Sequence, residues 1–315
     1  MSIRFNRRAI VMAATTTALT LACGLSQAAD KITLRLSSPA TNNDERALAM
    51  EQVFAPAVKD FADFKGHWSA SLFKQGTELE AISRGNLEMS IASAQELAEF
   101  FPEFGVFGAG YVHRDAEHQV KVFNSDFFKP YKEKVEKELG VKLLTVMYLG
   151  RRQVNLRNDK VIKTPADLAG IKLRMPGSES WLFLGKALGA NPVPMAFTEV
   201  YTGLQTGAVD GQDNPLPTVV KSKFYEVTKQ IVLTSHLVDL NYLTLSKKVW
   251  DKLTPIQQKQ LQAAADAAAK SETAKQIKQE QELVAFLKEK GLKVYEPDVA
   301  AFRKHVQEAY LKSDL

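Results

Sequence analysis

The 315-residue chain carries 41 basic and 36 acidic side chains, for a formal net charge of +5, and this length suits two lobes better than one core. The charges are mixed, and no basic run argues for a nucleic-acid partner. Cys23 is the only cysteine, which excludes an internal disulfide.

The first 28 residues are typical of a secretory signal peptide. Three arginines among the first eight residues precede an uncharged apolar stretch over 9–25, and Ser26-Gln27-Ala28 offers small residues for cleavage. We therefore expect segment 1–28 to be removed and the mature protein to lie in the periplasm. Arg7-Arg8 leaves twin-arginine export as an alternative route, and the residues before Cys23 fit a lipoprotein signal poorly.

The next part of the chain alternates strand and helix patterns. The expected strands are 32–37, 67–72, 87–91 and 141–149, and the expected helices are 43–61, 77–84 and 125–139. This order favours a mainly parallel sheet with both faces covered. Gly150-Arg151-Arg152-Gln153 is the expected crossing into a second lobe.

The second lobe is predicted from capping residues and periodicity. The expected helices are 164–169, 178–188 and 198–205, and extended segments follow over 227–245. Thr254-Pro255-Ile256-Gln257 forms a capping box, and the helix that it starts has no further stop signal until Gly291. That helix of about 35 residues would be longer than globular helices usually are.

Arg174 stands out as a candidate ligand-binding residue. Apolar and basic residues alternate over 171–175, which is the period of a half-buried strand, and Pro176 ends the strand because proline cannot donate to a sheet. A guanidinium at such a rim is well placed to hold a carboxylate through two parallel hydrogen bonds. The alternative is a surface arginine in a solvated ion pair.

The chain shows no catalytic constellation. Its five histidines are scattered without a partner at metal-ligand spacing, and neither a nucleophile elbow nor a phosphate loop is present. Asp210 and Asp213 are a weak candidate for paired carboxylates, because Asp210-Gly211 also suits a strand end and turn. We therefore expect a binding protein rather than an enzyme, with no cofactor and no metal.

Five ordered segments of the second half resemble the extracytoplasmic solute-binding proteins of tripartite ATP-independent periplasmic (TRAP) transporters. They are Gly170–Pro176, Ala187–Met195, Glu199–Tyr201, Leu204–Pro215 and Phe224–Val227. The likeness to sialic-acid-binding and dicarboxylate-binding members covers nearly the whole mature chain. It implies an α/β, two-lobed periplasmic binding protein fold, with a ligand cleft between the lobes and a long helix spanning both.

Each lobe is expected to be discontinuous in sequence. We expect lobe I over 29–149 plus 240–279, and lobe II over 150–239 plus 280–315. Several strand crossings would join them, as in binding proteins that close by hinge motion.

The resemblance also implies which second-lobe residues bind the ligand. Arg174 matches the arginine that holds the ligand carboxylate, and Asn214 matches an asparagine that contacts the same group. Arg152 matches a second ligand-contacting arginine, with Arg151 as its competitor because the spacing is shifted by two residues. Phe197 matches an aromatic wall residue, and plain core packing is its alternative.

In the first lobe, Ser38 and Ser93 occupy positions where relatives touch the distal part of the ligand. The sialic-acid binders place a carboxamide and a carboxylate there, so this chain departs from them. Glu78, at the start of a helix, is expected either to contact ligand hydroxyls or to favour the helix dipole.

The implied function is that of a monomeric periplasmic receptor. It would capture an organic acid and deliver it to the small and large membrane subunits of a TRAP transporter. The two serines favour a polyhydroxylated acid such as a uronate or aldonate over a C4-dicarboxylate. The alternative is a ligand sensor that serves a signalling receptor, or a binding protein of another transporter.

Overall fold

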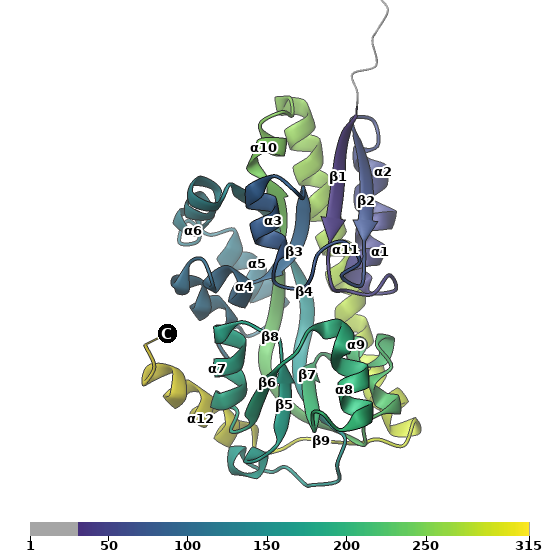
Figure 1. The fold of residues 1–315 in the computed structure, drawn as a ribbon, viewed down its shortest axis with the longest axis vertical. Helices are drawn as coiled ribbons and strands as arrows, with labels where there is room; N and C mark the ends of the chain where they lie inside the picture. Colours follow the sequence, from purple (N-terminus) through teal and green to yellow (C-terminus); the bar gives the residue numbers. More distant parts are fainter. Residues whose placement is uncertain (1–30, 315) are drawn as a thin grey trace, which may run out of the picture. The chain divides into compact units, whose positions relative to one another are not determined.

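The computed structural model describes residues 31–314, so the predicted signal peptide lies outside the described residues (Figure 1). The strands are β1 Ile32–Ser37, β2 Ala62–His67, β3 Met89–Ser93, β4 Val141–Leu156, β5 Lys172–Met175, β6 Asn191–Pro194, β7 Gly211–Asn214, β8 Gln230–Ser246 and β9 Lys293–Tyr295. Within residues 31–314, no helix combines the length and the apolar character that crossing a membrane requires.

Helices connect these strands along the chain and pack against the sheet. The α-helices are α1 Glu45–Ala49, α2 Ala55–Val58, α3 Glu78–Arg84, α4 Ala94–Ala98, α5 Ala116–Phe123, α6 Lys129–Lys134, α7 Glu179–Ala187, α8 Val200–Thr206, α9 Leu216–Lys221, α10 Lys247–Trp250, α11 Pro255–Glu289 and α12 Val299–Leu311. The π-helical turns are η1 Met50–Phe54 and η3 Val135–Leu139. The 3-10 helices are η2 Pro102–Gly108, η4 Pro165–Leu168, η5 Phe197–Glu199 and η6 Phe224–Glu226.

The strands form one mixed sheet in the order β2-β1-β3-β8-β4-β7-β5-β6, and β9 pairs with β8. β1 is parallel to β2 and β3, and β5 is parallel to β6 and β7. The long strands β4 and β8 are antiparallel to each other, and they join the two parallel groups. The prediction of a mainly parallel sheet therefore holds within each group and is wrong where the two long strands pass between them.

The fold has two lobes along these long strands (Figure 1). We call the part around β1, β2 and β3 the first lobe, and the part around β5, β6 and β7 the second lobe. Gly150 of β4 pairs with Asp239 of β8 near the middle, between two register shifts of the ladder. Gly150 has φ +126°, and a Cβ there would lie 2.6 Å from a Glu280 oxygen and from Pro215, so the crossing requires glycine.

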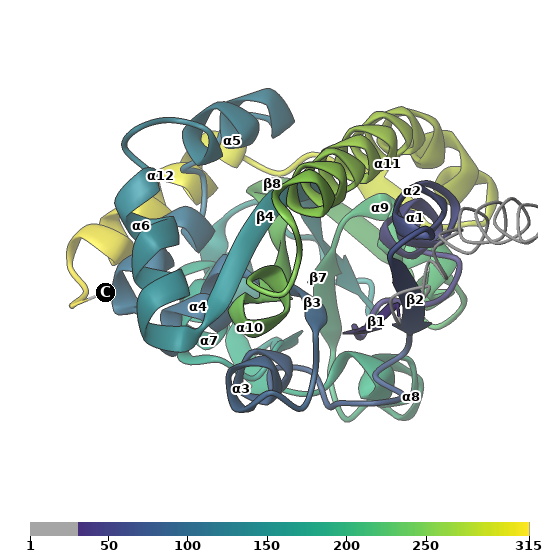
Figure 2. The same ribbon diagram turned by 90° about the horizontal axis from the view of Figure 1, so that it is seen from above.

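The long helix α11 is present as predicted, with 35 residues. The capping box forms, because Thr254 Oγ accepts from the Gln257 backbone N–H at 3.3 Å and Gln257 Oε1 accepts from the Thr254 N–H at 2.9 Å. Leu261 packs in the first-lobe core and Leu287 in the second-lobe core. α11 therefore spans both lobes, and it lies beside α1, α2 and α9 (Figure 2).

The strand predicted over 67–72 is wrong. The observed strand is β2, Ala62–His67, which pairs in parallel with β1. The preceding helix ends at Val58, and Phe64 packs edge-to-face against Phe54 at 5.6 Å. The alternation of β2 is hard to read because Gly66 interrupts it, and Ser69 and Ala70 turn the chain with positive φ angles.

Candidate functional site

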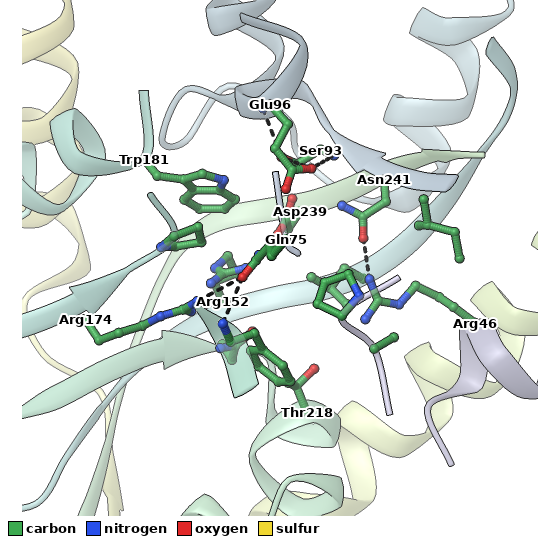
Figure 3. A pocket seen from close by; sticks show the side chains of 17 residues that line it. Arg46, Gln75, Ser93, Glu96, Arg152, Arg174, Trp181, Thr218, Asp239 and Asn241 are labelled. Carbon is green, nitrogen blue, oxygen red and sulfur yellow. Dashed lines mark hydrogen bonds and ion pairs between the residues drawn. The ribbon is translucent and has the colours of Figure 1, made fainter. Parts of the chain in front are cut away.

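A cavity of about 60 Å³ lies between the two lobes and is lined by residues of both (Figure 3). It is lined by Pro39, Ala40, Arg46, Gln75, Ile91, Ser93, Glu96, Leu149, Arg152, Arg174, Pro176, Trp181, Phe197, Asn214, Thr218, Asp239 and Asn241. Ten of these seventeen residues are polar or charged, so the lining is more polar than that of a typical small-molecule site and suits a polar, charged ligand.

Arg174 enters the cavity from the end of β5 and is only 1% exposed. Its Nε donates to the Met195 carbonyl at 2.9 Å, and its Nη2 lies 3.4 Å from Gln75 Oε1. No carboxylate of residues 31–314 lies within ion-pair distance of it. Burial and then the neighbouring charge of Arg152 lower the pKa of Arg174 to about 9. A buried cation without a carboxylate partner favours the binding of an anion.

Arg152 also lines the cavity, but two aspartates already neutralise it. Its Nε and Nη2 lie 2.7 and 3.0 Å from the carboxylate oxygens of Asp213, and its Nη1 lies 2.8 Å from Asp239 Oδ2. Nη2 also donates to the Asp213 carbonyl, and the guanidinium lies 4.5 Å from the ring centre of Trp181. Most of its donors are therefore used within the protein. Arg151 does not line this cavity and donates to the Arg114 carbonyl instead.

The partner Asp213 is fully buried on β7. Its Oδ2 lies 3.0 Å from His236 Nε2, and the other ring nitrogen of His236 lies 2.8 Å from Thr234 Oγ. Burial alone would raise the pKa of Asp213, but Arg152 and His236 outweigh burial and hold it well below its usual range. Asp213 is thus a structural carboxylate at the back of the cavity rather than part of a catalytic pair with Asp210.

Asn214 and Phe197 line the cavity beside Arg174. The Asn214 amide donates to Gln212 Oε1 at 2.6 Å from the end of β7. The Phe197 ring lies 5.8 Å from the Arg174 guanidinium and packs edge-to-face on Phe224. The structure thus brings together all four predicted second-lobe residues, which are Arg152, Arg174, Phe197 and Asn214. Their roles in ligand binding stay predictions.

Of the three first-lobe residues predicted to bind the ligand, one lines the cavity and two do not. Ser93 lines the cavity and caps α4. Ser38 is buried and does not line it, and its hydroxyl accepts from the Ala40 N–H at 3.2 Å. Glu78 does not line it either, and its Oε2 accepts from the Gly76 N–H at 2.7 Å. Burial, and then repulsion from Glu96, raises the pKa of Glu78 to about 8.

Sequence reasoning missed several polar lining residues, which are Arg46, Gln75, Glu96, Thr218, Asp239 and Asn241. Gln75 Oε1 accepts from the Phe197 N–H at 2.9 Å and so links the two lobes. The one available signal was the Ser93-x-x-Glu96 spacing of a capping box.

Comparisons with known proteins agree on one family. The sequence matches the bacterial extracellular solute-binding proteins, family 7, over residues 38–314. It is 33% identical to the sialic acid-binding periplasmic protein SiaP of Vibrio cholerae over 246 residues, which cover 78% of this chain and 76% of the relative. It is 31% identical to the C4-dicarboxylate-binding periplasmic protein DctP of Rhodobacter capsulatus, over 75% of this chain and 72% of the relative.

A solved structure is more similar still. It is a TRAP periplasmic solute binding protein from Roseobacter denitrificans with bound 3-deoxy-D-manno-oct-2-ulosonic acid (KDO). It is 64% identical, covers 90% of this chain and 94% of its own chain, and superposes with a TM-score of 0.90. The chain therefore belongs to the bacterial extracellular solute-binding protein family 7, the periplasmic solute-binding proteins of TRAP transporters.

Proposed function

We propose that this receptor binds a polyhydroxylated monocarboxylate, with KDO as the first candidate. The observation that carries the proposal is Arg174, a buried cation that lines the cavity and has no carboxylate partner among residues 31–314. The 64% identity to a protein with bound KDO supports a sugar acid of this size. The receptor acts as a binding protein and not as an enzyme.

The proposed mechanism is ligand-driven closure. The anion enters between open lobes, and Arg174 and Asn214 hold its carboxylate. The first lobe then closes over it, and the loss of water strengthens the ion pair. Contacts between the lobes support closure, because Lys221 of α9 lies 2.7 Å from Glu45 of α1.

We assign lobe I to 29–149 plus 240–279 and lobe II to 150–239 plus 280–315. The cores support this division. Leu34 and Leu245 belong to one apolar cluster, whereas Leu173 and Val154 belong to another. The hinge of the proposed closure then lies where β4 and β8 cross between the lobes.

The ligand is then passed to the two membrane subunits of a TRAP transporter by the monomeric receptor. A sensor that serves a signalling receptor is the second candidate. Transport of KDO into vesicles that contain the two membrane subunits, dependent on this protein, separates the two functions. Uptake that proceeds equally without the protein contradicts the transport role.

Export requires the signal peptide. We expect the periplasmic protein to lack residues 1–28, because Ser26-Gln27-Ala28 offers the small residues that signal peptidase reads. Intact-mass spectrometry of the exported protein measures this. A diacylglycerol-modified amino terminus at Cys23 would contradict it.

A thermal-shift screen against organic acids tests the ligand class. KDO at a hundred times its dissociation constant should stabilise the folded protein by about 2.7 kcal/mol, because only the folded state binds it. Aldonates and uronates are the next candidates, and succinate and sialic acid are the comparison ligands. If only succinate-type diacids or only sialic acid raise the melting temperature, the proposed class is wrong.

A further inference from the structure

Glu96 faces the cavity from the first lobe, and no cationic group of residues 31–314 lies within ion-pair distance of it. It is the third residue of α4, and its Oε2 accepts from the Ser93 N–H at 2.8 Å and lies 3.1 Å from Ser93 Oγ. Its other oxygen, Oε1, bonds to no residue of 31–314. In Figure 3 Glu96 reaches down from α4 at the top of the view, whereas Arg174 enters from β5 at the left.

The cations that could neutralise Glu96 are engaged elsewhere. Arg46 lines the same cavity, but its Nε lies 2.9 Å from Asp44 Oδ1 and its Nη1 donates to Asn241 Oδ1 at 2.6 Å. Arg152 is held by the two aspartates described above. Glu96 is therefore an unpaired carboxylate with one oxygen available to a ligand.

The groups around Glu96 make this end of the cavity negative. Asp239 lines the cavity, and Glu78 is near enough for its pKa to respond to the charge of Glu96. Burial raises the pKa of Glu96, and repulsion from Asp239 acts in the same direction, whereas the Ser93 hydrogen bonds and the charge of Arg46 lower it. The cavity is thus polarised, with an unpaired cation from β5 and an unpaired carboxylate from α4.

We propose that Glu96 determines specificity, by accepting a hydrogen bond from the hydroxyl-bearing tail of the ligand and excluding a second carboxylate from that end. The inference rests on the proposed function. A hydroxyl donor satisfies Oε1, because an ionised carboxylate only accepts. A second carboxylate would face like charge there without a counter-ion, which costs free energy in a partly buried site.

The fold itself does not impose this selection. A C4-dicarboxylate-binding relative belongs to the same family. The exclusion of diacids must therefore come from individual cavity residues. Glu96 is a residue that can exclude diacids, because its charge is opposite to that of Arg174. Since the two residues come from different lobes, they also orient the ligand as the lobes close.

The test compares the full mature protein with Glu96→Gln by calorimetric titration. The probes are KDO, D-galactonate and galactarate, and the last two differ only in whether carbon 6 is a hydroxymethyl group or a carboxylate. Galactarate affinity is measured by displacement of KDO. Glutamine has one acceptor oxygen, which the Ser93 N–H would occupy, so its NH₂ group and not an acceptor would face the ligand hydroxyl. We therefore expect Glu96→Gln to weaken KDO binding about 10- to 100-fold, the usual cost of losing a hydrogen bond to a charged group. The preference for KDO over galactarate should fall at least about tenfold.

Glu99→Gln is the matched control. Glu99 lies one helical turn further along, lines only an outer hollow, and accepts from the Glu179 N–H at 3.0 Å, which glutamine can also do. A folded Glu96→Gln protein with wild-type KDO affinity and an unchanged preference overturns the inference. A loss of KDO affinity with the preference unchanged overturns the exclusion of diacids. If the wild-type protein binds none of the three probes, the proposed function fails first and the inference with it.

Discussion

Replacing Arg174 with alanine is expected to weaken binding of the carboxylate ligand roughly 10²- to 10³-fold or more. Removing one partner of a buried, hydrogen-bonded charge pair costs about 3–5 kcal/mol, and 1.4 kcal/mol corresponds to a factor of ten. Arg174 is 1% exposed, so the ligand carboxylate would have no solvent to replace the lost partner.

The same substitution should not destabilise the ligand-free protein. Folding buries the Arg174 cation without a carboxylate partner among residues 31–314, and its pKa is lowered to about 9, so the folded state disfavours the charge. Alanine removes that cost along with two hydrogen bonds. Loss of binding with an unchanged or higher melting temperature would show that Arg174 serves the ligand rather than the fold.

Two further variants separate the role of the Arg174 guanidinium from that of a positive charge on the same strand. Arg174→Lys keeps a charge but loses the planar fork, so it should recover only part of the affinity. Lys172→Ala is the matched control, because Lys172 lies on the same strand, is exposed, and bonds only to the Gly207 carbonyl through its side chain. Calorimetric titration with KDO measures all three. Wild-type affinity in a folded Arg174→Ala protein would contradict the proposed site.

Local signals explain why the sequence predicted α11 and the place of Arg174 at the end of a strand. The strand of Arg174 has a clear period and ends at a proline, and both features are encoded within six residues. The helix α11 begins at Thr254 with a capping box and ends before Gly291, which has φ +91°. Each of these predictions depended on neighbours in sequence, so no knowledge of the tertiary fold was required.

The parts that sequence could not predict depend on distant partners. Arg152 is 61 residues from Asp213 and 87 from Asp239, and only the pairing of β4 with β7 and β8 brings the three together. The resemblance implied a ligand contact for Arg152, but its two aspartate partners could not be predicted from residues near it in sequence. Glu96 was missed because its capping role is local, whereas its position at the cavity follows from the packing of two lobes.

Replacing Asp213 with alanine is expected to lower the free energy of unfolding by about 3–5 kcal/mol, because it leaves a charge buried without its main partner. Arg152 is 3% exposed, and it would keep only Asp239 as a counter-ion. His236, fully buried, would also lose its acceptor. The effect on stability should therefore exceed that of any surface ion pair in the chain.

Asp159→Ala is the matched control for charge and residue type. Asp159 pairs with Lys229 at 2.8 Å, but the two side chains are 54% and 59% exposed, so we expect a change of about 0–1 kcal/mol. Urea denaturation of both variants at pH 7 compares the two. A destabilisation by Asp213→Ala no larger than that of the control would contradict the prediction.

The pH dependence of the free energy of unfolding tests the role of Asp213 independently. The pKa of Asp213 is lower in the folded protein than in the unfolded chain, so its contribution to stability is present above an unfolded pKa of about 3.9. That contribution is lost as the pH falls through the folded pKa. The difference between the wild-type protein and Asp213→Ala should therefore be constant from pH 7 to about 5 and shrink below about pH 4. A difference that stays constant down to pH 3 would indicate lost packing rather than a lost charge, because only the charge titrates.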